Sequence, residues 1–242
     1  MENQSLLLSI VTVTWNCVTT LEKTLKSVQA IKTDEIEYLI IDGVSTDGTL
    51  ELIKQYDSLV DHVLSERDHG IYNAMNKGAS LAKGKYVLFI NGDDELIADG
   101  FSDVLKHMKN ETAPIICTTT LCESIDNPSE ILVGKPQNLP FFNSIPHPSS
   151  FVKTSLLKEH PFNEELRIAA DYDFFLWAYI KKLTFDIVPA ITALHYRGGA
   201  SGDVALSEKE ITQIKKENLG IKYPVYLCIH ATYRFLKKCL MK

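Results

Sequence analysis

The feature that most constrains this chain is a repeated alternation between short β-branched runs and stretches whose apolar residues recur every three or four positions. Leu6–Thr14 and Glu37–Ile41 are typical of buried strands, and Leu21, Leu25 and Val28 between them share one helix face. This order is typical of an α/β domain. Further strands are predicted at His62–Ser65, Lys85–Ile90, Pro114–Thr118, Glu130–Val133 and Thr184–Ala190, and further helices after Asp47 and at 71–82, 171–182, 207–219 and 224–241.

Composition excludes several protein classes. Apolar residues make up 45% and charged residues 23% of the 242 residues, which is ordinary for a globular protein and argues against disorder, collagen and coiled coil. No apolar run is long enough to cross a bilayer, and Leu6–Val13 is expected to be a strand and not a signal peptide. The cysteines form no CxxC pair, which predicts reduced thiols in a cytoplasmic protein without disulfides or zinc. They are Cys17, Cys117, Cys122, Cys228 and Cys239.

The net charge of −6 is unevenly distributed. Residues 215–242 contain seven Lys or Arg and a single acid, Glu217, so this segment carries +6 and the rest of the chain −12. A body this acidic repels a nucleic-acid backbone, and we therefore expect no nucleic-acid partner. A phosphorylated ligand would need a metal ion or backbone dipoles to offset the repulsion.

Polar and acidic residues follow three of the predicted strands. These are Thr14-Trp15-Asn16, Asp42-Gly43 and Asn91-Gly92-Asp93-Asp94. In an open α/β sheet, ligands bind at the carboxyl ends of the strands. The adjacent carboxylates of Asp93 and Asp94 suit Mg²⁺ or Mn²⁺, which typically completes its shell with waters and substrate phosphates. An ordinary β-turn accounts for the same residues equally well.

These motifs occur together with others in a recognisable order. The set is Val11–Asn16, Ile41–Thr49, Ser65–Gly78, Asn91–Asp94, His147-Pro148 and Ile168–Leu176. Over roughly residues 6–201 the chain resembles family 2 glycosyltransferases of the GT-A fold, most closely the bacterial exopolysaccharide and colanic-acid type. The resemblance implies one GT-A catalytic domain over residues 1–205, with a nucleotide-sugar-binding half at about 1–112 and an acceptor half at 113–205. A basic helical tail would occupy 206–242.

The resemblance implies donor-binding roles for several residues. Asp93 and Asp94 would be a variant of the Asp-x-Asp motif that holds Mn²⁺ or Mg²⁺ on the donor diphosphate, with Asp94 the more direct ligand. Gly43 replaces a second acid that many relatives have, which leaves uracil and guanine both open as the base. The other implied nucleotide contacts are Thr12, Thr14, Asp42 and Asp68. Structural alternatives are β-forming threonines, a turn for Asp42 and a surface charge for Asp68.

Asp171 is the expected catalytic base. It occupies the second position of the family's Glu-Asp motif, with Ala170 in place of the Glu. At a helix start, the positive end of the dipole favours an ionised carboxylate. A base here would deprotonate the acceptor hydroxyl during a single displacement that inverts the anomeric centre. The alternative is that Asp171 is only a helix N-cap.

Two later segments supply further candidates. His195–Ser201 resembles the family's loop that closes over the diphosphate, and Arg197 would pair with phosphate oxygens bidentately. His195 precedes the Tyr-Arg pair, whereas the family's metal-binding His follows it, so His195 stays a second candidate in this loop. His147 lies in a proline-rich segment on the expected acceptor side and would contact a sugar hydroxyl or simply pack.

The predicted function is an inverting, metal-dependent hexosyl- or N-acetylhexosaminyltransferase. It would move a sugar from a nucleotide-sugar, in first place a UDP-sugar, to a saccharide or lipid-linked saccharide in bacterial surface polysaccharide synthesis. The basic amphipathic tail would bring it to the inner face of the cytoplasmic membrane or pack on the sheet. Alternatives are a sugar-1-phosphate nucleotidyltransferase, for which no Gly-rich phosphate loop follows the first strand, and a non-catalytic nucleotide-sugar-binding subunit.

Overall fold

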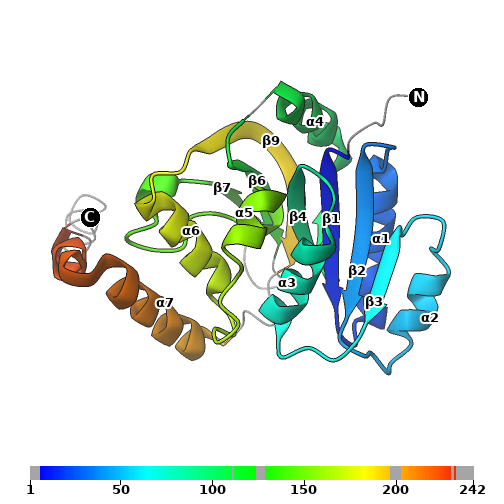
Figure 1. Ribbon diagram of the computed structural model, residues 1–242, viewed down its shortest axis with the longest axis horizontal. Coiled ribbons are helices and arrows are strands. Elements are labelled where there is room, and N and C mark those ends of the chain that lie inside the picture. The colour runs from blue at the N-terminus through cyan, green and yellow to red at the C-terminus, as the bar shows by residue number, and fades with distance from the viewer. Residues whose placement is uncertain (1–5, 111, 124–128, 197–202, 230–231, 233–242) are drawn as a thin grey trace.

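The computed structural model of the chain describes residues 6–110, 112–123, 129–196, 203–229 and 232. Its framework is a mixed sheet of nine strands in the order β3-β2-β1-β4-β8-β6-β9-β5, with β7 paired to β6 (Figure 1). The strands are β1 (Leu8–Thr14), β2 (Ile36–Asp42), β3 (His62–Ser65), β4 (Tyr86–Asn91), β5 (Glu95–Leu96), β6 (Ile115–Glu123), β7 (Glu130–Val133), β8 (Ser150–Lys153) and β9 (Phe185–Tyr196).

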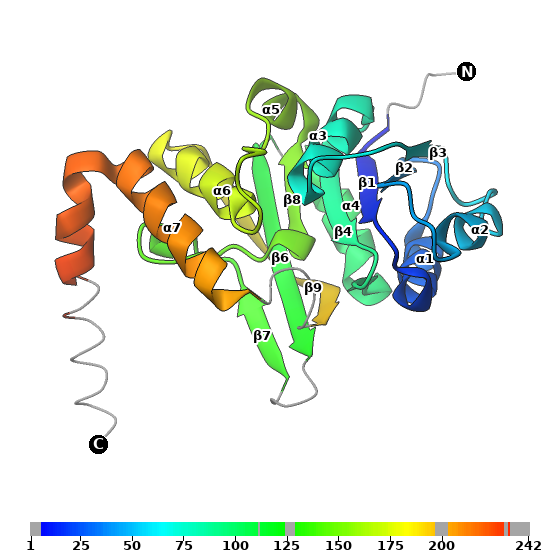
Figure 2. The same ribbon diagram turned by 90° about the horizontal axis from the view of Figure 1, so that it is seen from below.

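Helices cover both faces of this sheet. They are α1 (Val18–Ile31), α2 (Thr49–Lys54), α3 (Ile71–Leu81), α4 (Phe101–Asn110), α5 (Thr154–Glu159), α6 (Ala170–Ile180) and α7 (Val204–Leu219), with short 3₁₀ turns η1 (Ala98–Gly100), η2 (Pro136–Asn138), η3 (His147–Ser149) and η5 (Gly220–Lys222). One hydrophobic core lies between the sheet and α1 and α4, and a second lies between the sheet and α3, α5, α6 and α7. Figure 2 shows α1 and α6 on opposite sides of the strands β6, β8, β4 and β1.

The first half of the sheet is parallel. β3, β2, β1 and β4 run in one direction, and every residue of β1 and β2 is buried. Strands that are covered on both faces read as continuous apolar runs, which explains why the sequence predicts them well. Their carboxyl ends therefore meet at one edge of the sheet, as the α/β prediction requires.

The second half departs from the predicted elements. β8 runs antiparallel to β4 and to β6, while β6 and β9 pair in parallel. β6 continues past the predicted end at Thr118 because its polar threonines are buried: Thr118 Oγ1 donates to Ser149 O (3.1 Å) and Thr120 Oγ1 to Ser149 Oγ (2.7 Å). Because these buried residues are polar, the apolar pattern in the sequence ends before the strand does.

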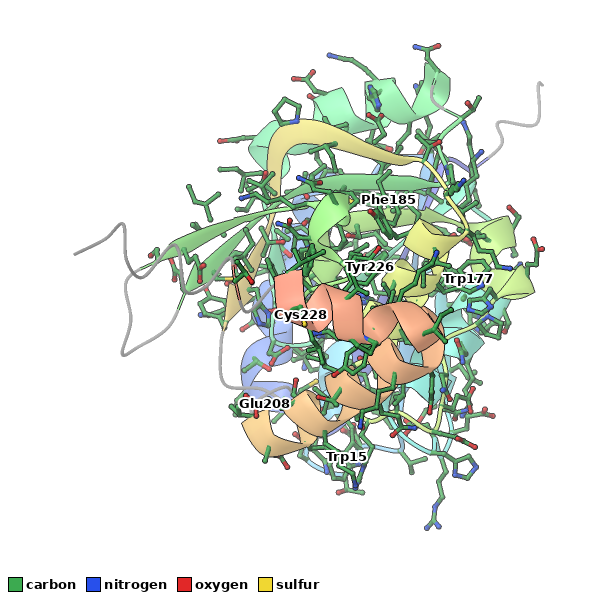
Figure 3. All side chains as sticks on the ribbon, turned by 90° about the vertical axis from the view of Figure 1, so that its left-hand side faces the viewer. Trp15, Trp177, Phe185, Glu208, Tyr226 and Cys228 are labelled. Atoms are coloured by element: carbon green, nitrogen blue, oxygen red, sulfur yellow. The ribbon has the colours of Figure 1, made fainter. Side chains whose placement is uncertain are left out.

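The segment predicted as a tail begins inside the packed body. α7 lies along α6 and buries Glu210, Ile214 and Leu219, so residues 206–219 share the core of the domain. Residues 223–229 are helical, and the Tyr226 ring packs edge-on against Phe141 at 5.5 Å between centroids (Figure 3). Residues 233–242 lie outside the described part. Within the described residues, every helix is too short or too polar to span a bilayer.

Candidate active site

A cavity of about 770 Å³ opens where β1 and β4 end. It is lined by the turn from β1 into α1, by the start of α3, and by the residues that follow β4. The turn is tight, since Asn16 has a left-handed backbone with φ of 49° and its Oδ1 accepts from Thr46 N at 2.9 Å. Trp15 on this turn is 71% exposed, which is unusual for an indole ring. A planar group bound in the cavity would cover this ring.

Asp42, predicted to contact the nucleotide, holds three strand ends together. Its carboxylate is fully buried and accepts four hydrogen bonds, from Thr14 Oγ1 (3.1 Å), Ser45 N (3.0 Å), Ser45 Oγ (2.5 Å) and Ser65 Oγ (2.7 Å). Both carboxylate oxygens are thus engaged within the protein, and Asp42 does not line the cavity. Its hydrogen bonds to Ser45 belong to the turn that follows β2, the structural alternative considered for this residue.

The two threonines predicted beside the nucleotide have different positions. Thr14 lines the cavity, although its hydroxyl is committed to Asp42. Thr12 is completely buried in the middle of β1, and its Oγ1 accepts from the Tyr38 hydroxyl at 3.0 Å. Because Thr12 lies two residues before the strand end on the covered part of the sheet, it does not line either cavity described here.

Asp68 lines the same cavity of about 770 Å³ as Trp15. Its Oδ1 accepts from Gly70 N at 3.0 Å. A Cβ atom added at Gly43 would lie only 2.7 Å from Asp68 Oδ2 and 3.3 Å from Trp15 Cδ1. The glycine therefore leaves the space that the Asp68 carboxylate fills, and this carboxylate stands where a side chain at position 43 would begin.

A second cavity, of about 500 Å³, adjoins the first. It brings together five of the predicted residues from distant parts of the sequence: Asp93, Asp94, His147, Asp171 and His195. The two cavities share a wall made of Ile71, Tyr72, Asn91, Asp93, Arg167 and Ile168. A ligand in one cavity would therefore lie against a ligand in the other.

Asp94 is buried, and only one of its two carboxylate oxygens has hydrogen-bond partners among the described residues. Its Oδ1 lies 2.8 Å from His195 Nδ1 and accepts from Tyr196 N at 3.3 Å, which ties the residue after β4 to the end of β9. Its Oδ2 is inaccessible and has no hydrogen-bond partner among the described residues, and the same holds for Asn91 Oδ1 in the same cavity. Unpaired buried oxygens are costly, and these two atoms have free acceptor capacity for a cation or a water molecule.

Asp93 stands beside this pair and lines both cavities. Burial, followed by the charge of Asp94, raises the pKa of Asp93 above its usual value. Two neighbouring acids whose charges disfavour each other are a setting in which a cation would bind. Within the described part of the chain, however, no three His, Cys, Asp or Glu side chains form a complete metal cluster. Any metal here would need ligands from solvent or substrate.

Asp171 lies in the first turn of α6 and faces the second cavity. Its two oxygens accept only long hydrogen bonds, from the Tyr72 hydroxyl at 3.3 Å and from Asn143 Nδ2 at 3.4 Å. The Tyr72 hydroxyl donates more closely to Ile168 O, at 2.6 Å. Because the single Tyr72 proton is directed mainly to Ile168 O, the Asp171 carboxylate is only weakly bonded where it lines the cavity.

His147 lines the same cavity through its ring. The ring stacks on Phe89 at 5.6 Å between centroids, and neither ring nitrogen has a hydrogen-bond partner in the described residues. Burial lowers the pKa of His147, which favours the neutral ring at pH 7. Both of the roles considered from the sequence, packing and contact with a sugar hydroxyl, fit this position.

Of the two remaining candidates, only His195 lies within the described residues. It contacts Asp94 through Nδ1, whereas Arg197 lies outside the described residues. The sequence did not single out Asn91, Tyr72 or Asn143. Asn91 and Tyr72 lie inside the Asn91–Asp94 and Ser65–Gly78 motifs, which were usable signals, whereas Asn143 carries none.

Comparison with known proteins identifies the family of this chain. The family model described as "Glycosyl transferase family 2" matches residues 9–183. The chain belongs to that family. An uncharacterised glycosyltransferase of Methanocaldococcus jannaschii is 25% identical over 197 residues, which cover 76% of this chain and 66% of the relative. The teichuronic acid biosynthesis glycosyltransferase TuaG of Bacillus subtilis is 28% identical over 149 residues, or 60% of this chain and 59% of TuaG.

Solved structures share the fold of this family 2 chain. S. aureus TarS residues 1–349 in complex with UDP matches with a TM-score of 0.68 at 18% identity, covering 94% of this chain and 70% of that one. The mannosyltransferase PcManGT of Pyrobaculum calidifontis, in complex with GDP-Man and Mn²⁺, matches with a TM-score of 0.68 at 15% identity, covering 95% of this chain and 70% of its own. The fold is GT-A, as the motifs predicted.

Proposed function

We propose that this family 2 chain is an inverting glycosyltransferase that uses a nucleotide-sugar donor and a divalent metal ion. The observation that carries the proposal is the second cavity, in which Asp171 meets Asp93 and Asp94 although some 80 residues separate them. An acid pair for the leaving diphosphate and a separate carboxylate for the incoming hydroxyl are the parts that such a displacement needs.

The acid pair fits a divalent cation. Asp94 Oδ2 and Asn91 Oδ1 are buried oxygens without partners, and hard oxygen atoms are what Mg²⁺ and Mn²⁺ prefer. Asp94 and Asp93 would hold the ion together with donor phosphates and water, and His195 would orient Asp94. Once bound, the ion neutralises charge on the leaving nucleoside diphosphate.

Asp171 would act as the general base. As the acceptor oxygen forms its bond to the anomeric carbon, its proton passes to an Asp171 oxygen and the bond from that carbon to the diphosphate oxygen breaks. Attack and departure on opposite faces invert the anomeric centre. The long contacts from Tyr72 and Asn143 hold the carboxylate without saturating it.

The donor would occupy the cavity of about 770 Å³ at the ends of β1 and β4. Asp68 and Trp15 would contact the base and ribose, with Thr14 and Asp42 shaping the floor behind them. We propose a UDP-sugar that carries a hexose or N-acetylhexosamine, since structures of TarS hold UDP and UDP-GlcNAc. Arg197 would pair with the diphosphate.

The acceptor would occupy the second cavity, beside His147, as a saccharide or lipid-linked saccharide. Relatives named for teichuronic acid biosynthesis and for hyaluronan synthesis support a role in bacterial surface polysaccharide assembly. We further propose that the protein works in the cytoplasm and contacts the inner membrane through the helix at 223–229. Val225 and Ile229 on this helix are 59% and 51% exposed, and Ile221, in the preceding turn η5, is 95% exposed.

The central test compares two aspartates on α6. Asp171→Asn should lower turnover of the donor by at least about a hundredfold, the usual contribution of a general base, and leave UDP binding intact. Asp173→Asn is the matched control, because Asp173 accepts from Asn218 at 2.8 Å and lies outside both cavities. Turnover of Asp171→Asn at the wild-type rate would refute the assignment of the base.

A thermal-shift screen of UDP, GDP and dTDP, each with Mn²⁺ and with EDTA, tests the donor site. Binding to the native state alone raises the melting temperature in proportion to affinity and concentration. We expect UDP to stabilise most, and only with Mn²⁺. Equal stabilisation in EDTA would contradict the metal role, and metal-dependent binding without turnover of any sugar nucleotide would support a non-catalytic subunit.

A further inference from the structure

Glu210 of α7 makes an unusual set of contacts. Its side chain is buried, at 6% exposed, and its carboxylate accepts hydrogen bonds from three successive backbone amides. Arg167 N donates to Oε1 at 2.8 Å, while Ile168 N and Ala169 N donate to Oε2 at 3.0 Å each. No ion pair to Glu210 is present in the described residues, so these amides are what compensates the buried charge.

The three amides precede the first turn of α6. The positive end of the α6 dipole lies next to these amides and favours an anion. Ala169, the N-cap residue of α6, makes no side-chain capping hydrogen bond. Glu210, more than 40 positions later in the chain, supplies the acceptor for the amide of this N-cap residue and for the two amides before it.

The same segment carries the site. Asp171 follows Ala169 by two residues, and Ile168 O accepts from the Tyr72 hydroxyl that also contacts Asp171. Arg167 and Ile168 belong to the wall shared by the two cavities. A carboxylate that fixes the backbone of 167–169 therefore fixes where the Asp171 carboxylate stands relative to the acceptor.

We infer that Glu210 is a positioning residue for the catalytic base: its carboxylate clamps the 167–169 backbone and so aims Asp171 at the acceptor oxygen. This inference rests on the proposed role of Asp171. Removal of the clamp lets the first turn of α6 and the adjoining wall residues Arg167 and Ile168 shift. The residues proposed to contact UDP and the metal, Trp15, Asp68, Asp93 and Asp94, belong to other segments and stay in place. Displacement of a reacting group by about 1 Å is enough to cost on the order of a hundredfold in rate.

The test uses the full chain with Glu210→Ala and Glu210→Gln. Glutamine keeps one oxygen acceptor and turns an NH₂ group toward a backbone donor, so its effect should lie between those of Glu and Ala. The rate measured is UDP release with water as acceptor, from the UDP-sugar that stabilises the protein most. We expect kcat to fall by about tenfold or more in Glu210→Ala and by less in Glu210→Gln, with UDP affinity changed by less than about threefold.

Two further measurements separate positioning from general destabilisation. Amide hydrogen exchange should speed up at residues 167–169 in both variants while β1 and β2 stay protected. Glu208→Gln is the matched control, since Glu208 is exposed two residues away on the same helix (Figure 3), and it should behave as wild type. Variants that lose UDP affinity together with kcat, or that keep wild-type kcat after the amides open, would overturn the inference. Wild-type turnover in Asp171→Asn would instead overturn the proposed base.

Discussion

At the scale of single residues, the missing side chain of Gly43 makes room for the Asp68 carboxylate at the proposed donor cavity. The space above its Cα is filled by the Asp68 carboxylate, which arrives from the segment between β3 and α3. The second acid that the family motif places after β2 is absent, yet a carboxylate occupies the neighbouring space. In the proposed function, donor recognition would therefore depend on this contact between Gly43 and Asp68, which lie in two different segments of the chain.

We predict that Gly43→Ala weakens UDP binding about tenfold, because the new Cβ displaces Asp68 Oδ2 and a hydrogen bond to a charged group contributes roughly 1.5–3 kcal/mol. Isothermal titration of UDP with Mn²⁺ measures this loss. The control is a double-mutant cycle with Asp68→Ala. Gly43→Ala should have no further effect in the Asp68→Ala background, and an additive loss would show that Gly43 acts by another route.

The sequence indicated only in part which residues meet in the cavity. Asp93 and Asp94 follow a strand and were therefore expected at the carboxyl edge of the sheet, whereas Asp171 was expected there from the resemblance to the family motif. The three residues line one cavity, and their chemical roles are the proposal made above. Asp42 looked equivalent to them, but its four internal hydrogen bonds depend on Ser45 and Ser65, whose orientation no local pattern encodes. Thr12 was similarly ambiguous, because a strand threonine serves a pocket or a core according to which face is covered.

At the scale of elements, α5 and α6 meet through a stacked pair. The His160 ring, at the end of α5, lies on the Trp177 ring of α6 with 3.7 Å between centroids and an angle of 11°. Burial lowers the pKa of His160, and the nearby Asp173 carboxylate opposes the shift only in part. The neutral ring is therefore the form that the folded protein prefers.

The lowered pKa of His160 determines how the stability of the protein depends on pH. A histidine whose folded pKa is depressed contributes stability above its unfolded pKa, and this stability is lost as the pH falls below about 6.5 toward the folded pKa. We predict that His160→Gln flattens the decline of the urea midpoint between pH 7 and pH 5 compared with wild type. His62→Gln, at an exposed position on β3, should leave the decline unchanged. An equally steep decline in His160→Gln would contradict the prediction.

The elements of the first half were predictable, and those of the second half less so. β1 and β2 are uninterrupted buried runs, whereas β8 emerges from a proline-rich segment and α4 and α5 were not predicted at all. β6 and β9 carry buried threonines and a partly exposed face, so neither strand shows the apolar continuity that marks a central parallel strand.

At the scale of the whole molecule, charge and apolar surface coincide at one end of the chain. The helix at 223–229 exposes Val225 and Ile229 and stands in the segment that carries +6. We predict that Val225→Glu/Ile229→Glu lowers binding to vesicles containing phosphatidylglycerol by about tenfold or more, since burial of such side chains contributes roughly 1.5–3 kcal/mol each. Co-sedimentation measures the bound fraction.

The control for this prediction is Val204→Glu, a 67% exposed valine at the far end of α7, which should bind as wild type does. Vesicles of phosphatidylcholine alone test the electrostatic part, because a basic segment gains little there. Equal sedimentation of the double variant with phosphatidylglycerol vesicles would exclude this stripe as the membrane contact.

The wall shared by the two cavities has a consequence for recombining such enzymes. Its residues come from two parts of the chain: Tyr72 and Asn91 from the first 112 residues, and Arg167 and Ile168 from the later ones. The contact between these two parts, here called the joint, includes the hydrogen bond from the Tyr72 hydroxyl to Ile168 O at 2.6 Å. Chimeras that splice the front of one family member to the back of another would inherit mismatched partners at this boundary. Exchanging donor preference between relatives therefore requires transplanting both sides of the joint as a unit.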